Sequence, residues 1–324
     1  MFKHVGRLIG TSARDKKRKE KEFFAAVVIG EISIIDELIK FDDIDPNTLG
    51  VDALTALHIA AEKGDIAVGN YFLQLKDIDI NSHKHARNGE SPLITATIFN
   101  RMGFAALLLK YGANPNIQNR FGRTALHVAV IKKNLVMVKK LLFCHAQPNV
   151  CDAFDNTPLS LSVIEYPSKK VCELLLRWNA DPNLRHVKTD SLMLELALNC
   201  KSLNQIELVK LLLNHGAQLN VVDSISHHSM LHMVAITGYL PLAKFLLELE
   251  KIDYNLKDTS GRTAYDVAVE HRNKDVANAF KEIIFKKNSK IKETKKLRSE
   301  SSKFKRIFRS NRSVRFSEED DNEK

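Results

Sequence analysis

The 324-residue sequence predicts an all-α solenoid, a stack of repeated pairs of antiparallel helices, on the strength of two repeating features. One is an asparagine that recurs at intervals of 34, 35, 33, 34, 37 and 35 residues, at Asn47, Asn81, Asn116, Asn149, Asn183, Asn220 and Asn255. The other is an apolar run at helical spacing within most intervals, such as Leu107–Leu109 and Leu174–Leu176. A fixed period over most of a chain indicates units that bury their apolar faces against one another.

The first helix of each unit is predicted to begin with a capping residue. Thr or Ser stands about eight residues after most of the asparagines, as in Thr55-Ala-Leu-His58 and Thr124-Ala-Leu-His127. Their hydroxyls can accept from the exposed N–H groups of a first helical turn, and proline suits that turn because its missing N–H is not needed there. Small residues such as Ala60, Ala96 and Ala129 follow and predict close approach between helices.

The second helix of each unit is predicted to end on a residue in the left-handed conformation. Gly112 and Gly216 fit this position without a Cβ penalty. His145 and Asn179 stand at the matching positions of other units, and both residue types tolerate a positive φ.

These features together resemble the ankyrin-repeat family across residues 21–285. The resemblance implies about seven full repeats, each with a short β-hairpin loop, plus an N-terminal capping unit. It also implies that the helix-start histidines His58, His127 and His232 are hydrogen-bonding scaffold residues. The unit from 188 to 220 is irregular, because Glu195 stands where a histidine is expected and 199–205 adds about three residues between its helices.

Charge divides the chain into three expected parts. Residues 1–22 hold 8 Lys/Arg against 3 Asp/Glu, and residues 286–324 hold 14 against 7, so the +10 net charge of the chain belongs to the two ends. We therefore expect a basic, disordered segment over 1–20, the repeat domain over 21–285, and a disordered tail over 286–324 that is basic and then acidic.

The resemblance implies a non-enzymatic adaptor or scaffold that binds a protein partner in a groove formed by hairpin tips and inner helices. The variable tip positions supply candidate contact residues, in which arginine and phenylalanine offer hot-spot chemistry for an acidic, partly apolar segment: Arg120, Phe121, Arg123, Phe154, Arg185 and Lys188. The alternative is that these tips are solvated loops. No phosphate-binding glycine loop and no nucleophile motif is present in the sequence, so we expect no enzyme and no cofactor.

Metal binding is not expected from the sequence. His228 and His232 are four residues apart, but the third ligand that a zinc site needs is missing from the pattern. The four cysteines form no Cys-x-x-Cys pair, and we expect them to be reduced packing residues.

The N-terminal basic run Lys16, Lys17, Arg18 and Lys19 is interpreted either as a nuclear-import signal or as a solvated lead-in to the first helix. The longest apolar run, 23–29, is far shorter than the ~20 residues of a membrane span, and the N-terminus lacks a signal-peptide core. We expect a cytoplasmic or nuclear protein with no transmembrane segment.

The tail contains Arg312, Val314 and Phe316 in the order Arg-Ser-Val-Arg-Phe. This resembles the docking motif with which regulators bind the type 1 protein phosphatase catalytic subunit, in which an extended segment adds to a sheet edge and two apolar side chains on one face enter pockets. Ser310, Ser313 and Ser317 are candidate phosphorylation sites, since basic or acidic residues flank them. The alternative to both functions is an electrostatic tether that holds the repeats on nucleic acid or an anionic membrane through the basic ends.

Overall fold

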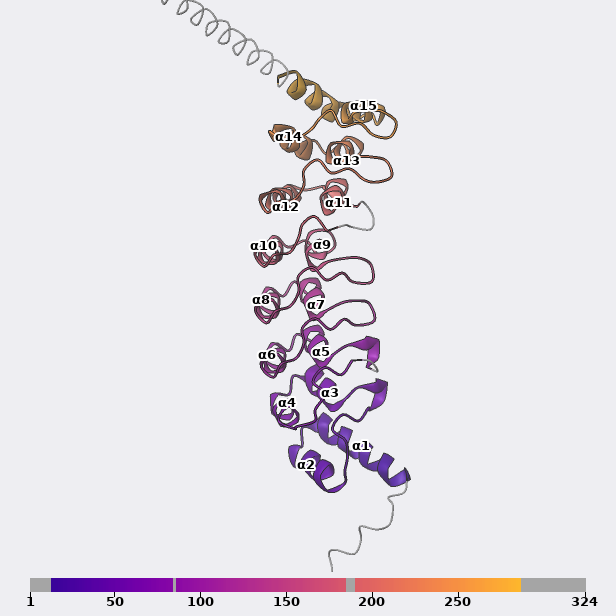
Figure 1. Ribbon diagram of the computed structural model, residues 1–324, viewed down its shortest axis with the longest axis vertical. Coiled ribbons are helices and arrows are strands. Elements are labelled where there is room, and N and C mark those ends of the chain that lie inside the picture. Colours follow the sequence, from indigo (N-terminus) through magenta and orange to yellow (C-terminus); the bar gives the residue numbers. More distant parts are fainter. Residues whose placement is uncertain (1–12, 84–85, 185–189, 287–324) are drawn as a thin grey trace, which may run out of the picture. The chain divides into compact units, whose positions relative to one another are not determined.

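The computed structural model describes residues 13–83, 86–184 and 190–286 (Figure 1). The chain forms two compact units, one of Met1–Leu196 with Glu207–Gln218 and the other of Ala197–Ile206 with Leu219–Lys324. The helices follow one another along the chain as α1 (Ala13–Ile29), α2 (Ile32–Phe41), α3 (Ala56–Lys63), α4 (Ile66–Leu73), α5 (Pro92–Ile98), α6 (Met102–Lys110), α7 (Ala125–Ile131), α8 (Leu135–Phe143), α9 (Pro158–Val163), α10 (Lys169–Arg177), α11 (Leu192–Asn199), α12 (Leu203–Asn214), α13 (Met230–Thr237), α14 (Leu240–Glu248) and α15 (Ala264–Glu270). Residues 274–286 are also helical. The predicted stack of helix pairs is confirmed.

In the first unit, the helix pairs form two rows (Figure 1). The first helices α3, α5, α7 and α9 make one row, the second helices α4, α6, α8 and α10 make the other, and the loops between repeats project beyond the first row. Ala60, Ala96 and Ala129 are fully buried in the first helices, so the expected close approach is confirmed. Leucines of the second helices, such as Leu108, Leu141 and Leu175, are fully buried against them and form the core.

The helix starts carry the predicted caps. Ser91 accepts from the N–H of Ile94, and Thr157 exchanges hydrogen bonds with Ser160. Thr55 does the same with a histidine: the backbone N–H of Thr55 donates to Nδ1 of His58 at 3.2 Å, so Nδ1 is an acceptor and Nε2 carries the proton. That Nε2 lies 2.9 Å from the carbonyl oxygen of Glu90 in the next repeat. His58 therefore caps its own helix and holds the neighbouring repeat.

His127 and His232 repeat this arrangement. Their Nδ1 atoms accept from Thr124 and Ser229, and their Nε2 atoms lie 3.1 Å from the carbonyl oxygens of Asn156 and Arg262. The scaffold role that the family resemblance implied for these histidines is confirmed by this geometry.

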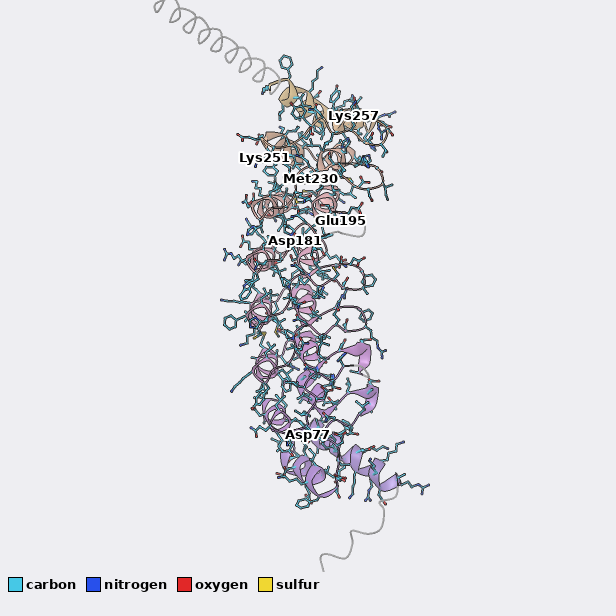
Figure 2. The ribbon with its side chains drawn as sticks, in the orientation of Figure 1. Asp77, Asp181, Glu195, Met230, Lys251 and Lys257 are labelled. Atoms are coloured by element: carbon cyan, nitrogen blue, oxygen red, sulfur yellow. The ribbon has the colours of Figure 1, made fainter. Side chains whose placement is uncertain are left out.

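The recurring asparagines link each repeat to the next. Asn149 donates from its side-chain amide to the carbonyl oxygen of Asn179 at 3.1 Å, and its side-chain oxygen accepts from the N–H of Asp181 at 2.9 Å. Four other asparagines also bind a carbonyl oxygen and the N–H two residues later, namely Asn47 with Asp77 and Asp79, Asn116 with His145 and Gln147, Asn183 with Gly216 and Gln218, and Asn220 with Lys251 and Asp253. Figure 2 marks three of these partners, Asp77, Asp181 and Lys251. We call this set of bonds the asparagine ladder.

The loops between repeats are tight turns. The described residues hold no β-strand, so the expected β-hairpins do not form as strands. Their β-structure is limited to two isolated bridges, Val222 with Ser229 and Lys257 with Thr263. Helix ends follow the prediction more closely. Gly112 and Gly216 each have φ of 87°, and His145 and Asn179 reach 64° and 61° in their place.

The N-terminal part differs from the expectation. Residues 13–20, which we assigned to a disordered segment, are the first turns of α1. Contacts along the helix hold it in place: Phe23 is fully buried and packs edge-to-face on Phe72, Ala26 and Val27 are also buried, and Lys19 pairs with Asp42. The charge of the basic run is therefore compatible with a helix because the apolar contacts lie further along it.

The irregular repeat is organised by Gln205. Its side-chain oxygen accepts from the N–H of Lys201 at 2.7 Å, and its amide donates to the carbonyl oxygen of Asn199 at 3.1 Å. The added residues thus form a closed loop between α11 and α12. Glu195, which replaces a helix-start histidine, is buried in α11.

The buried histidines predict that acid destabilises the protein. Burial lowers the pKa of His58, His127 and His232 below the ordinary value of 6.5. The unfolded chain then takes up protons first as the pH falls, so stability is complete above pH ~6.5 and declines below it. We expect the thermal unfolding temperature, followed by circular dichroism, to be lower at pH 5.5 than at pH 7.5.

Ser160 stands at the position of the capping histidines in its own repeat, so a serine substitution at His127 provides a control. In His127→Ser, the lost bond to Asn156 lowers stability at pH 7.5 by about 1 kcal/mol, while the further loss on acidification becomes smaller because one titrating group is gone. An acid-induced loss as large in this variant as in the native chain would contradict the assignment.

Candidate functional site

Two neighbouring turns of the first unit carry the aromatic residues that the sequence singled out. We call residues 118–123 finger 1 and residues 151–156 finger 2. Each is closed by backbone bonds, from the N–H of Asn119 to Arg123 in finger 1 and from Asp152 to Asn156 in finger 2. The N–H of Ala153 donates to the carbonyl oxygen of Phe121 at 2.8 Å and joins the two tips. Phe121 and Phe154 are therefore held on adjacent fingers.

Both phenylalanines present apolar surface to solvent. Phe121 is 45% exposed and Phe154 is 61% exposed. The backbone between the fingers is fixed by Gly122, which has φ of +69° and would place a Cβ 2.6 Å from the N of Ala153. Only glycine fits there, so the spacing of the two aromatic side chains is set by the backbone and not by their own packing.

The arginines of finger 1 have different surroundings. Nε of Arg123 lies 3.3 Å from the carboxylate of Asp152, which is buried and also accepts from the N–H groups of Phe154 and Asn156. Arg123 thus ties finger 1 to finger 2. The Arg120 side chain is exposed, and the backbone N–H of Arg120 donates to the carbonyl oxygen of Asn88 in the preceding repeat. Of the two arginines, Arg120 has the more accessible charge.

Several predicted site residues lie outside the described part of the chain. These are Arg185, Lys188 and all the tail residues, namely Arg312, Val314, Phe316, Ser310, Ser313 and Ser317. The N-terminal candidates are described and lie in α1. Lys16, Lys17 and Arg18 are exposed there, while Lys19 is partly buried against Asp42.

The histidine pair and the cysteines have structural surroundings. The rings of His228 and His232 stack with centroids 5.5 Å apart, and Nε2 of His228 lies 3.7 Å from Asp258. Burial works to raise the pKa of Asp258, but the N–H and guanidinium of Arg262 and the N–H of Ser260 outweigh it and hold the pKa at about 2. Burial raises the pKa of the Cys172 thiol to about 12. In the described part of the chain, no three His, Cys, Asp or Glu side chains form a metal-binding group.

The repeat domain contains a basic stretch that is not apparent when only the net charges of the two ends and of the body are compared. Residues 91–151 contain no Asp or Glu and eight basic residues, which are Arg101, Lys110, Arg120, Arg123, Lys132, Lys133, Lys139 and Lys140. A count along the sequence in windows of one repeat would have found it. Lys133 and Lys139 are exposed, and Lys139 lies one helical turn before Phe143, which is 70% exposed at the end of α8. The near-neutral body therefore contains a basic region that includes finger 1.

Among the residues that the structure describes, no helix combines the length and the apolar content needed to cross a bilayer.

Two curated relatives match part of the chain. The 26S proteasome non-ATPase regulatory subunit 10 of Dictyostelium discoideum is 30% identical over 105 residues, 32% of this chain and 44% of that protein. The ankyrin repeat protein FPV031 of fowlpox virus is 33% identical over 181 residues, 55% of this chain and 52% of that protein. The chain thus spans about half the length of these relatives.

The fold has a counterpart among solved structures. The ankyrin repeat domain of Bcl-3, described as a unique member of the IkappaB protein family, matches with a TM-score of 0.63 and 26% identity over 71% of this chain and 99% of that domain. The family model for ankyrin repeats (3 copies) matches residues 23–119, 104–186 and 194–291. With the helix pairs, capping histidines and asparagine ladder described above, these matches show that the chain belongs to the ankyrin-repeat family.

Proposed function

We propose that the protein is a non-enzymatic adaptor and that fingers 1 and 2 are its contact surface for a protein partner. The observation that carries this proposal is the pair of exposed phenylalanines, Phe121 and Phe154, on fingers whose backbones are bonded to each other. Turns whose backbone is already held in place lose little backbone entropy on binding, and aromatic and arginine residues dominate the binding energy of interfaces.

Charge indicates the kind of partner. Arg120 is exposed next to Phe121, and the stretch that includes finger 1 has no carboxylate from 91 to 151. Finger 2 adds the exposed Asp155 beside Phe154, so the basic character is strongest on the side of finger 1. The partner segment is therefore apolar where it meets the two rings and acidic where it meets Arg120. The ankyrin-repeat family, which is typically a non-enzymatic interaction domain, supports a role in protein binding.

Removing the two rings tests the finger surface. In Phe121→Ala/Phe154→Ala, we expect partners captured by the full chain to be lost, since truncating a hot-spot aromatic costs about 2 kcal/mol or more. Quantitative affinity capture from a cell extract is the measurement. Phe143→Ala is the matched control, because Phe143 is at least as exposed but lies at the end of α8.

Retention of every partner by the double variant would remove the finger proposal. Binding that falls steeply as the salt concentration rises would instead favour the electrostatic tether to nucleic acid or an anionic membrane, since charge neutralisation is strongly salt-dependent and apolar contact is not. The observation that favours this alternative is the basic composition of both ends together with the carboxylate-free stretch 91–151.

We propose in addition that the tail recruits the type 1 protein phosphatase catalytic subunit through Arg312, Val314 and Phe316. The support is the spacing of these residues in the sequence. In an extended segment, Val314 and Phe316 lie on one face and can enter two apolar pockets while Arg312 meets acidic surface. An adaptor of this kind would hold one partner on the fingers and the phosphatase on the tail.

A peptide of residues 305–324 tests the tail. We expect it to bind the phosphatase catalytic subunit in isothermal titration calorimetry, and Val314→Ala/Phe316→Ala to weaken binding at least about tenfold through the loss of buried apolar surface. A phosphate on Ser313 places about −2 charge between Arg312 and Val314 and should weaken binding as well. Equal affinity of the native and the doubly substituted peptide would exclude the motif.

We also propose that the protein works in the cytoplasm, the nucleus or both, with Lys16, Lys17 and Arg18 as an import signal on the exposed side of α1. In a fluorescently labelled full chain, Lys16→Ala/Lys17→Ala should lower the nuclear fraction. Both side chains are exposed, so the fold is retained and circular dichroism should be unchanged. An unaltered nuclear fraction would leave the alternative, a solvated start of α1.

A further inference from the structure

The last repeat of the chain ends differently from the repeats before it. In the second unit, α14 ends at Glu248, and the chain then turns back so that Lys251 and Asp253 bond to the side chain of Asn220. Ser229 and Thr263, which begin the first helices of the last two repeats, are 34 residues apart. By the same offset from Glu248, the helix that begins at residue 274 should end near residue 282. It continues instead to at least Lys286.

This longer helix leaves the asparagine ladder open. Asn255 is the ladder residue of the last repeat, and the positions equivalent to Lys251 and Asp253 are Phe285 and residue 287. Phe285 is helical, so its carbonyl is not offered in a returning turn. No described residue forms a hydrogen bond with the side-chain amide of Asn255, although its backbone N–H donates to Asp253.

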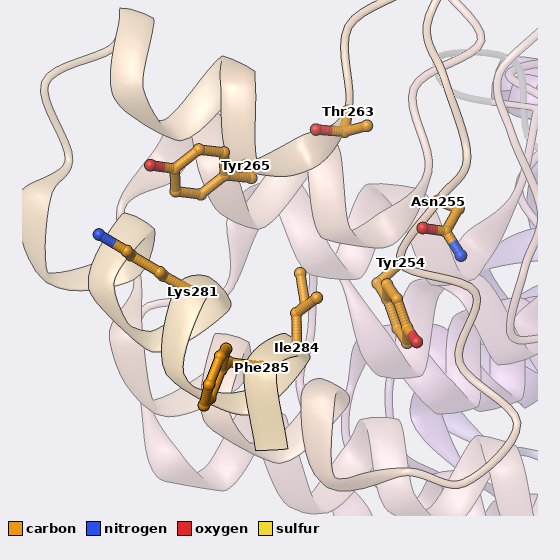
Figure 3. Close-up of a pocket in the computed structure, with 7 residues that line it drawn as sticks. All are labelled: Tyr254, Asn255, Thr263, Tyr265, Lys281, Ile284 and Phe285. Carbon is orange, nitrogen blue, oxygen red and sulfur yellow. The ribbon is translucent and has the colours of Figure 1, made fainter. Parts of the chain in front are cut away.

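A pocket of about 430 Å³ lies beside this open end (Figure 3). Tyr254 and Asn255 lie along one wall, and Ile284 and Phe285, which belong to the added helical turn, lie along another. The remaining lining residues are Thr263, Tyr265 and Lys281. The pocket therefore occupies the region next to the ladder asparagine that a returning turn fills in the earlier repeats.

Two residues of the pocket wall are more polar than their equivalents in the preceding repeat. Tyr265 and Lys281 stand at the positions that Leu231 and Leu247 hold in the preceding repeat, where both leucines are buried. Tyrosine and lysine bury an apolar stem while keeping a polar group accessible. The pocket thus joins aromatic and aliphatic surface to a cation and to the Asn255 amide, whose donor and acceptor have no partner among the described residues.

The filled rungs of the ladder show what chemistry such a site accepts. In each of these asparagine–turn pairs, which we call rungs, the turn supplies a carbonyl oxygen and, two residues later, an N–H. The residue between these two groups is apolar and buried in four rungs. It is Ala146, Ala180, Ala217 and Ile252 in the rungs of Asn116, Asn149, Asn183 and Asn220. The N–H donor belongs to an aspartate in three rungs, Asp79, Asp181 and Asp253.

We propose that this pocket binds an extended segment of a partner protein that carries a small or branched apolar residue followed by an acidic residue. The amide of Asn255 takes the main-chain carbonyl and N–H on either side of the apolar residue, which packs between Tyr254 and Ile284. The acidic side chain meets Lys281. This surface is independent of fingers 1 and 2, which belong to the other unit, so either proposal can fail without the other.

The probe is a capped synthetic peptide with the sequence of residues 250–255, Glu-Lys-Ile-Asp-Tyr-Asn, titrated into the isotope-labelled full chain and followed by NMR. We expect saturable shifts of the Asn255 side-chain amide and of its neighbours Tyr254 and Phe285. Asn255→Ala should weaken binding about tenfold, because two hydrogen bonds are lost. A peptide N-methylated at its aspartate, which lacks the N–H donor, should weaken binding to the native chain by several fold and should add no further loss in the variant.

Stability measurements separate binding from folding. Asn255→Ala should leave the unfolding temperature unchanged, whereas Asn149→Ala, whose side chain makes both ladder bonds, should lower it. Equal binding of the methylated and unmethylated peptides, or no shift at the pocket residues, would overturn the proposal. A tail peptide of residues 305–324 that shifts the same signals more strongly, or self-association of the native chain that Asn255→Ala abolishes, would assign the pocket to this chain itself and overturn the partner assignment.

Discussion

Each side chain of the asparagine ladder satisfies the backbone of the repeat that follows it. A turn between repeats presents carbonyl and N–H groups that have no partner within the turn. The ladder bonds that pair them lie at the surface, where one intramolecular hydrogen bond contributes about 1 kcal/mol. Asn149 binds one of each, two residues apart, and the same geometry recurs at Asn47, Asn116, Asn183 and Asn220. The bond fixes where the next turn lies, and therefore where the next helix pair can pack. The leucine core and the positions of the fingers follow from this placement.

The histidine caps also join each repeat to the next one. His127 holds its own helix start through Nδ1 and the next finger through Nε2, so one neutral ring couples the two. Because both nitrogens are already committed, a proton can be added only at the expense of a cap. The pair of the partly buried Arg123 and the buried Asp152 extends this coupling to the fingers themselves. The tips that carry Phe121 and Phe154 are thus fixed by groups in the interior, which is why their own side chains are free to face solvent.

The repeat period, the caps and the helix ends could be predicted from the sequence, because each rests on interactions within about one repeat. Thr124 next to His127 and the left-handed His145 are local patterns with few physical solutions. Arg123 could not be assigned correctly in the same way: its neighbours in sequence suggest an exposed tip, and only its contact with Asp152, 29 residues away, shows that it ties two turns together. The pocket beside Asn255 depends on where the helix after residue 274 ends. Residues 283–286 continue a helical pattern, and nothing in their composition marks a stop.

The ladder recognises the backbone and not the side chains of the next repeat. Each asparagine recognises main-chain atoms that every residue except proline can supply, so it selects a backbone geometry rather than particular side chains. A gene segment of one period that is duplicated or lost inside the array brings with it one asparagine and one pair of backbone groups, and the junctions on both sides still match. A gain or loss of a partial period separates the two and leaves a junction without its bond. The array can therefore change in length by whole repeats during evolution while its binding turns diversify independently.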